Sequence, residues 1–119
     1  MQSLVIKCTV GAEEPERANQ AFTVAAAGVA AGATVSLWLT GDAAYFGVPG
    51  NAEAFMLDLA TPLNELRDIV LAGGTLTVCS QCAARRGLVQ GDLLQGVEVA
   101  GAAVFTEQVL EEGAQALVY

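Results

Sequence analysis

Leu4-Val-Ile-Lys-Cys-Thr-Val10 and Thr34-Val-Ser-Leu-Trp-Leu-Thr40 are the two short apolar runs that decide the fold of this chain. Both contain several β-branched residues and both end at a glycine, which is typical of buried strands. Between them, Pro15 precedes a segment in which alanine, phenylalanine and valine recur at helical spacing as far as Gly32. A strand, a helix and a strand of these lengths predict two parallel strands joined by a right-handed crossover.

The alternation of strands and helices continues along the rest of the chain. The stretch from Gly41 to Gly50 is predicted to be a loop with an apolar tip, and Thr61 and Pro62 are predicted to cap and start the next helix. Further helices are expected over 63–72, 80–87 and 103–112, and further strands over 75–79, 97–100 and 116–119. We therefore expect one α/β domain over residues 1–119, a three-layer α/β/α fold with a mostly parallel five-stranded sheet.

The charge and composition exclude several classes of function. Thirteen acidic residues against five basic ones give a net charge of −8, which argues against direct binding of nucleic acid. The chain has no histidine, so it lacks the commonest general base and metal ligand. No glycine-rich phosphate-binding motif occurs either, so we expect no cofactor and no metal.

The apolar content bears on location and assembly. No apolar run approaches the ~20 residues that a membrane span requires. The first residues after Met1 lack the basic and long apolar segments of a signal peptide, so a cytoplasmic protein is expected. Hydrophobic residues make up 54% of the chain and charged ones 15%, which indicates a homo-oligomer because little polar material is left for the surface.

Cys79 is the leading candidate for a reactive residue. It lies at the end of the predicted strand 75–79, where a helix begins, and the carboxyl ends of parallel strands are where sites gather. The free amides of a helix N-terminus favour a thiolate. Arg86 lies two helical turns further on the same face and can lean back towards the thiol, whereas Arg85 points elsewhere. Position alone is equally compatible with an inert buried thiol and solvated arginines.

The other cysteines and the aromatic pair leave alternatives open. Cys82 completes a C-x-x-C pattern with Cys79, which is typical of a dithiol redox site or half of a metal site, but it could equally face the core. Cys8 lies within the first strand and is predicted to be buried. Tyr45 and Phe46 could line a crevice or an interface, or form the packed tip of their own loop.

The segment Leu76-Thr-Val-Cys-Ser-Gln-Cys-Ala-Ala-Arg-Arg-Gly-Leu-Val89 resembles the strand, cysteine, short helix and Arg-Gly segment of the DsrE-like family. In the TusD-type sulfur-relay members of that family, an Arg-Arg pair and a glycine follow the reactive cysteine at the spacing of Cys79, Arg85, Arg86 and Gly87. The resemblance extends over the whole chain. Cys82 departs from the TusD-type pattern.

The resemblance implies a parallel sheet between helices, assembly as a trimer or hexamer, and a persulfide carried on Cys79. Arg85 and Arg86 would then favour the anionic sulfur or dock a partner. The chain would be a sulfur carrier of the sulfurtransferase type that works between a sulfur-donor protein and an acceptor protein. Cys82 could resolve the persulfide by forming a disulfide with Cys79 and expelling sulfide.

Two other functions stay open at this point. One is a non-catalytic oligomeric binding module of the same fold, which would use the crevice near Tyr45 and Phe46. The other is a redox protein with a reversible Cys79–Cys82 disulfide.

Overall fold

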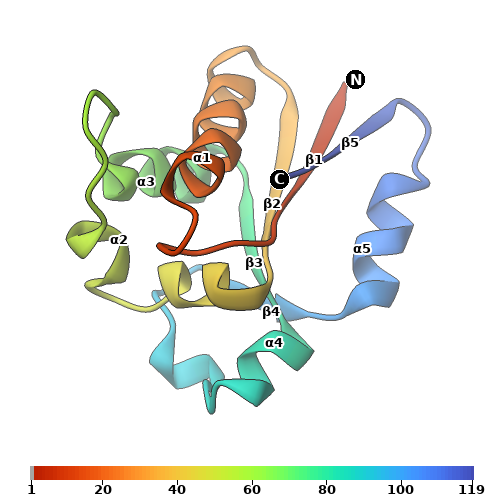
Figure 1. Cartoon of the computed structure of the whole chain (residues 1–119). Coiled ribbons are helices and arrows are strands. Elements are labelled where there is room, and N and C mark those ends of the chain that lie inside the picture. Colours follow the sequence, from red (N-terminus) through yellow and green to blue (C-terminus); the bar gives the residue numbers. More distant parts are fainter. Residues whose placement is uncertain (1) are drawn as a thin grey trace.

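The computed structural model describes residues 2–119. Strands and helices alternate through most of the chain (Figure 1). In chain order the elements are β1 (Ser3–Cys8), α1 (Pro15–Ala30), β2 (Thr34–Leu39), the 3₁₀ helix η1 (Gly41–Gly47), α2 (Asn51–Ala54), α3 (Leu63–Gly73), β3 (Thr75–Cys79), α4 (Ser80–Arg85), the 3₁₀ helix η2 (Gln90–Asp92), β4 (Glu98–Ala100), α5 (Ala102–Val109) and β5 (Ala114–Val118).

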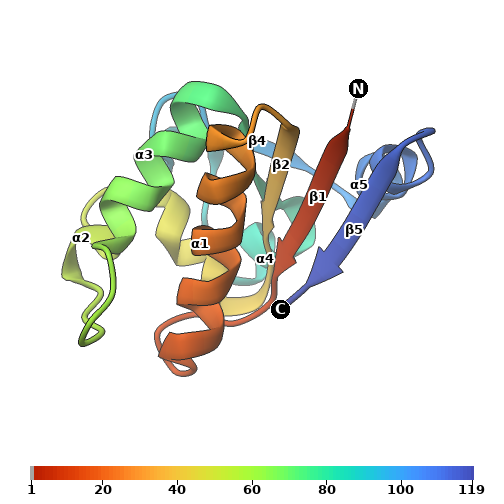
Figure 2. The same cartoon turned by 90° about the horizontal axis from the view of Figure 1, so that it is seen from above.

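The five strands form one sheet in the order β4-β3-β2-β1-β5, and every neighbouring pair is parallel. This confirms the expected α/β fold, and the sheet is fully rather than mostly parallel. α1 and α3 lie side by side on one face, and α5 lies on the other (Figure 1 and Figure 2). α4 follows β3 directly at the carboxyl edge of the sheet.

The face under α1 and α3 carries the hydrophobic core. Alternate strand residues such as Ile6, Leu37 and Leu76 are fully buried there and pack against Phe22 of α1. Alternation places polar side chains on the opposite face, including Ser36 of β2 and Thr75 and Thr77 of β3. α5 has eight residues, none of them fully buried, and it packs mainly against β5. The second face is therefore covered only in part.

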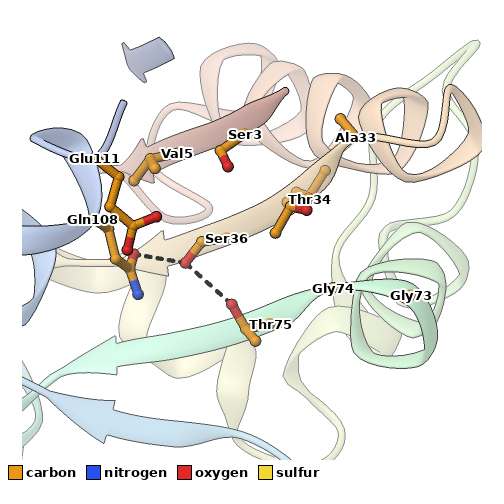
Figure 3. A pocket seen from close by; sticks show the side chains of 11 residues that line it. Ser3, Val5, Ala33, Thr34, Ser36, Gly73, Gly74, Thr75, Gln108 and Glu111 are labelled. Atoms are coloured by element: carbon orange, nitrogen blue, oxygen red, sulfur yellow. Dashed lines mark hydrogen bonds between the residues drawn. The ribbon is translucent and has the colours of Figure 1, made fainter. Parts of the chain in front are cut away.

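A hollow of about 430 Å³ occupies the uncovered part of this second face (Figure 3). It lies at the amino ends of β1, β2 and β3, and Gln108 and Glu111 form its wall on the α5 side. Thr75 Oγ1 donates to Ser36 Oγ (3.1 Å), and Ser36 Oγ donates to Gln108 Oε1 (2.9 Å). A hydrogen-bonded chain of side chains thus ties α5 to the sheet across the hollow.

The predicted loop 41–50 is wrong in its details, because residues 41–47 form η1 and a short helix follows at 51–54. Phe46 is buried in the core, where its ring meets Phe22 and Phe55 edge to face at 5.6 Å, while Tyr45 is exposed. Gly41 has a φ of +55°, and a Cβ there would lie 2.7 Å from the Thr9 carbonyl oxygen. Core packing and this tight turn give the segment its helical form.

The expected cap of α3 is also wrong. The helix begins at Leu63, Pro62 occupies the capping position, and no side chain caps the first turn. The helix still begins within a residue or two of the prediction, because its apolar side is set by Leu63, Leu66 and Val70, all of which are buried.

In the described part of the chain, no helix is both long and apolar enough to cross a membrane.

Candidate functional site

Cys79 is the last residue of β3 and immediately precedes α4, as the sequence predicts. Its side chain is half-buried, so the thiol is neither sealed in the core nor fully in water. The extended backbone at this position (φ −61°, ψ 127°) turns the chain from strand into helix. The sulfur therefore lies at the carboxyl edge of the sheet, beside the first amides of α4.

Several groups act on the ionisation of this thiol. Partial burial raises the pKa of Cys79, but hydrogen bonds from the backbone amide and the thiol of Cys82 and from the Gln81 amide lower it. The positive charge of Lys7 lowers it further. The net result is a pKa below the ordinary value of a thiol, which favours the nucleophilic thiolate.

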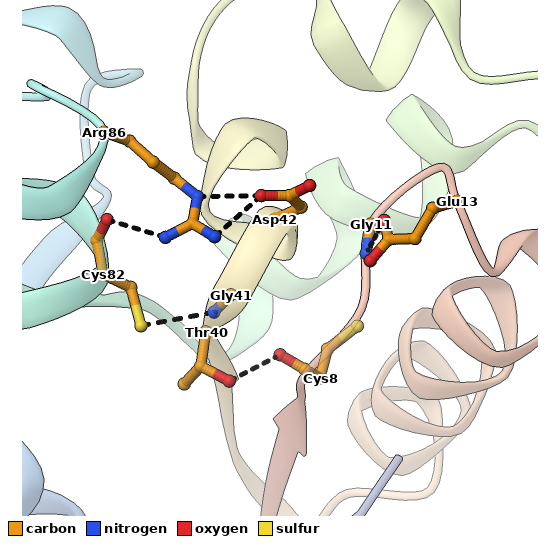
Figure 4. Close-up of polar contacts among 8 residues, drawn as sticks. All are labelled: Cys8, Gly11, Glu13, Thr40, Gly41, Asp42, Cys82 and Arg86. Atoms are coloured by element: carbon orange, nitrogen blue, oxygen red, sulfur yellow. Dashed lines mark hydrogen bonds and ion pairs between the residues drawn. The ribbon is translucent and has the colours of Figure 1, made fainter.

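Cys82 is buried on the inner side of α4 and belongs to the core cluster. Its Sγ accepts a hydrogen bond from the Gly41 amide at 3.2 Å (Figure 4). The same thiol is hydrogen-bonded to Cys79. Cys82 therefore faces the core and adjoins Cys79 at once, so the structural and redox interpretations of this residue are compatible with each other.

Arg86 leans back along α4, as expected, but its guanidinium ends on other partners. Nε and Nη2 donate to Oδ1 of Asp42 at 2.9 and 2.7 Å, and Nη1 donates to the Cys82 carbonyl oxygen at 3.1 Å (Figure 4). The guanidinium also lies 5.9 Å from the centre of the Tyr45 ring. Arg86 thus fastens α4 to η1 and holds Cys82 against Gly41, while Asp42 balances its charge. Arg85 is exposed in the last turn of the helix.

Lys7 is the residue that sequence reasoning missed. It is the only lysine in the chain and lies between the fully buried residues Ile6 and Cys8. A charge inside an apolar parallel strand is unusual, because both faces of such a strand are normally covered. This unusual lysine was the feature of the sequence that could have identified Lys7 as part of the site. Asp42 was missed as well, because its partner lies 44 residues away.

Cys8 is buried in the core, as predicted. Its side chain has no exposed surface and its Sγ donates to the Val10 carbonyl oxygen at 3.3 Å. Burial raises the pKa of Cys8 to about 11. This thiol stays protonated and shielded at neutral pH, and it takes no part in the site.

A second hollow lies beside η1. It has a volume of about 300 Å³ and is lined by Glu13, Asp42, Tyr45, Asn51 and Phe55, among others. The crevice that the sequence suggested near Tyr45 and Phe46 is therefore present. Within residues 2–119, no group of three or more cysteine, aspartate or glutamate side chains is arranged to hold a metal ion.

Comparisons with known proteins agree with this architecture. The ychN protein from E. coli superimposes with a TM-score of 0.83 at 20% sequence identity, over 100% of both chains. A protein of unknown function from Methanobacterium thermoautotrophicum, MTH1491, gives a TM-score of 0.67 at 13% identity, again over 100% of both chains. At these identities the likeness concerns the fold. No curated protein sequence matches the chain significantly.

The family model gives a more specific result, because it matches residues 2–119, which include β3, Cys79 and α4. The match extends over all five strands of the parallel sheet. It agrees with the resemblance seen in the Cys-Ser-Gln-Cys-Ala-Ala-Arg-Arg-Gly segment. This chain therefore belongs to the DsrE/DsrF-like family.

Proposed function

We propose that this protein is a sulfur carrier that holds a persulfide on Cys79 and passes the outer sulfur to a thiol of an acceptor protein. The observation that carries the proposal is the half-exposed Cys79 thiol, whose pKa is lowered at the carboxyl edge of the sheet. Family membership and the Arg-Arg-Gly spacing support it.

The chemistry is thiol exchange without net oxidation. The Cys79 thiolate attacks the outer sulfur of a donor persulfide, R–S–SH, so that a new S–S bond forms as the donor S–S bond breaks. The donor leaves as the thiolate R–S⁻, and Cys79 becomes Cys79–S–SH. An acceptor thiolate then attacks that same outer sulfur and leaves with it, which regenerates the Cys79 thiolate.

The neighbouring side chains have different parts in this proposal. Arg86 is a positioning residue, because it acts through Asp42 and the Cys82 carbonyl to hold α4 in place. Arg85 is exposed on the same helix and is suited to docking an acidic surface of a donor or acceptor protein. Cys82 could attack the inner sulfur of the persulfide, form the Cys79–Cys82 disulfide and release hydrosulfide.

Intact-mass measurement after incubation with a protein persulfide donor tests the proposal. Wild type should gain the mass of one sulfur atom, and this adduct should be removed by excess acceptor thiol. Cys79→Ser should gain nothing, whereas the matched variant Cys8→Ser should still be loaded, because Cys8 is sealed in the core. Failure to load the wild type under conditions in which the donor modifies another carrier would overturn the proposal.

A dithiol redox function is the second candidate, and the hydrogen bond between the Cys82 and Cys79 thiols favours it. It predicts a reversible Cys79–Cys82 disulfide that forms in a defined thiol–disulfide buffer. Peptide mapping of the oxidised protein measures this. Absence of the disulfide under oxidising conditions would exclude the redox function and would also exclude resolution of the persulfide by Cys82.

Self-association is a further part of the proposed function. Val104 of α5, Leu110 just after it, and Leu117 and Val118 of the edge strand β5 have exposed apolar side chains. A trimer or hexamer that covers these residues accounts for the apolar composition. The solution mass measures this. A monomer at micromolar concentration would contradict it.

The non-catalytic binding module is distinguished by the variant Cys79→Ser. Partner binding that this variant leaves undiminished would favour the binding module over the sulfur carrier.

A further inference from the structure

We propose that Lys7 is the counter-ion of the anionic sulfur on Cys79, and that Phe105 and Trp38 hold its ammonium in place. The biological purpose of this pairing rests on the proposed sulfur-carrier function. The pairing itself concerns the bare thiol and can be tested without any persulfide.

Strand order and register place Lys7 on the same face of the sheet as Cys79. Lys7 of β1 is paired with Trp38 of β2, and Trp38 is paired with Thr77 of β3. These three residues form a row across the sheet, with side chains on the α5 face. Cys79 follows two residues after Thr77, on that face and nearer the carboxyl edge. A lysine side chain is long enough to extend from this row towards the edge.

Two aromatic side chains hold the Lys7 ammonium in place. Lys7 Nζ lies 3.9 Å from the centre of the Phe105 ring, a cation–π arrangement. The Phe105 ring meets Trp38 edge to face at 5.5 Å, and Trp38 is itself fixed by the hydrogen bond from Nε1 to Gln108 Oε1 (2.8 Å). Lys7 of β1 is therefore held by side chains from two other elements, Phe105 of α5 and Trp38 of β2.

The start of α5 brings Lys7, Phe105 and Trp38 close to the Cys79 thiol. Gly101 immediately precedes α5, and a Cβ on Gly101 would lie 3.3 Å from Ser80 Oγ at the start of α4. The residue before α5 therefore lies close to the first residue of α4, and Phe105 lies one turn into α5. Lys7, Phe105 and Trp38 consequently lie at the same carboxyl end of the α5 face as the Cys79 sulfur.

The charge of Lys7 is also free for this role. Among the ion pairs of the described residues, the cations are Arg67 and Arg86, and Lys7 is in none of them. A cation–π contact leaves the positive charge unbalanced by any carboxylate. Arg86, by contrast, has its charge matched by Asp42.

The other charged groups around the thiol do not replace Lys7. On the surrounding elements these are Arg85 and the Arg86–Asp42 pair beside α4, exposed Glu98 on β4 and exposed Glu107 on α5. The two glutamates would disfavour a thiolate. The largest effects on the pKa of Cys79 include the charge of Lys7 and not that of Arg85 or Arg86.

The decisive experiment is the pH dependence of Cys79 alkylation by iodoacetamide, resolved by peptide mass spectrometry. Lys7→Met should react about threefold to tenfold more slowly at pH 7, with its profile shifted to higher pH, because an attractive charge beside the thiolate has been removed. Lys7→Arg should stay close to wild type. Arg17→Met is the matched control, since it removes one positive charge from an exposed position of α1, on the opposite face. A Lys7→Met profile that superimposes on wild type would overturn the inference.

Chemical modification of the folded wild type covers the case in which Lys7→Met fails to fold. Because Lys7 is the only lysine, acetylation removes the side-chain charge at this one site, and reductive methylation retains it. Acetylated protein should lose the fast alkylation and methylated protein should keep it. Equal rates in the two products would contradict the pairing.

Sulfur loading separates this inference from the proposed function. A wild-type protein whose alkylation depends on Lys7 but which accepts no sulfur would overturn the carrier function and leave the pairing intact. Normal loading with a Lys7-independent profile would overturn the pairing alone.

Discussion

The two faces of the sheet differ in how they are covered and in what their side chains can do. The face under α1 and α3 is closed by aliphatic and aromatic side chains that have almost no exposed surface. The face under α5 carries hydroxyl groups, a lysine and a half-buried cysteine, and it keeps a hollow of about 430 Å³. We infer that the first face supplies the stability of the fold and that the second is free to hold reactive groups.

The two faces also treat the same side chain differently. Cys8 and Cys79 both end parallel strands, at the same edge of the sheet. On the closed face burial raises the pKa of Cys8 to about 11, while on the open face hydrogen bonds and Lys7 lower the pKa of Cys79. The environment of the face, and not the position at a strand end, raises the pKa of one thiol and lowers that of the other.

The largest expected effect is on the closed face. Phe22 has no exposed surface and its ring contacts Phe46 edge to face, so Phe22→Ala should lower the free energy of unfolding by about 3–5 kcal/mol. Phe105→Ala on the open face should cost clearly less, because Phe105 is only half-buried. Urea denaturation of both variants measures the difference. Equal losses would show that α5 contributes as much core as α1.

The next effect is the selectivity between the two thiols. Burial raises the pKa of Cys8 to about 11, whereas hydrogen bonds and Lys7 lower the pKa of Cys79 below that of an ordinary thiol, so the thiolate fraction at pH 7 is much larger at Cys79. Limiting iodoacetamide should therefore label Cys79 in the folded protein well before Cys8, and the rate at Cys79 should rise with pH until its pKa is passed. Labelling in urea is the control, since unfolding should remove the preference. Comparable rates in the folded state would contradict the comparison of the faces.

The smallest effect concerns the hydrogen bonds that fasten α5. Gln108 Oε1 accepts from both Trp38 Nε1 and Ser36 Oγ, so Gln108→Ala leaves two donors without their acceptor. The expected loss is about 1 kcal/mol, at the low end for such changes, because the adjoining hollow admits water to replace the lost bonds. Gln115→Ala, at an exposed site on β5, should change the stability by less than about 0.5 kcal/mol. A loss of stability larger than that of Phe105→Ala would mean that the hydrogen bonds of Gln108, and not the ring contact between Phe105 and Trp38, hold α5 on the sheet.

Much of the fold could be predicted because local patterns and tertiary packing agree. Thr75–Cys79 is a β-strand with the predicted bounds, and α1 begins at Pro15, as its first-turn chemistry indicates. The segment 41–54 was different, since its helical form depends on burying Phe46 between Phe22 and Phe55. No periodicity within so short a stretch reports contacts with residues further along the chain.

The site could be predicted only as far as it is local. Cys79, Cys82 and Arg86 are close in sequence, and the strand-to-helix transition that positions them is visible in the residue types. The partners from elsewhere were not predictable, because Asp42 and Lys7 reach this edge through the strand order β4-β3-β2-β1-β5. That order is a property of the assembled sheet.

The hydrogen bond from Trp38 to Gln108 also gives the molecule an optical probe. Trp38 is the only tryptophan in the chain. It belongs to β2 and is almost fully buried beneath α5. Indole fluorescence responds to the loss of a hydrogen bond on Nε1 and to the entry of water around the ring. The emission of the native protein, without any label, therefore reports whether α5 stays packed on the sheet when Cys79 is chemically modified.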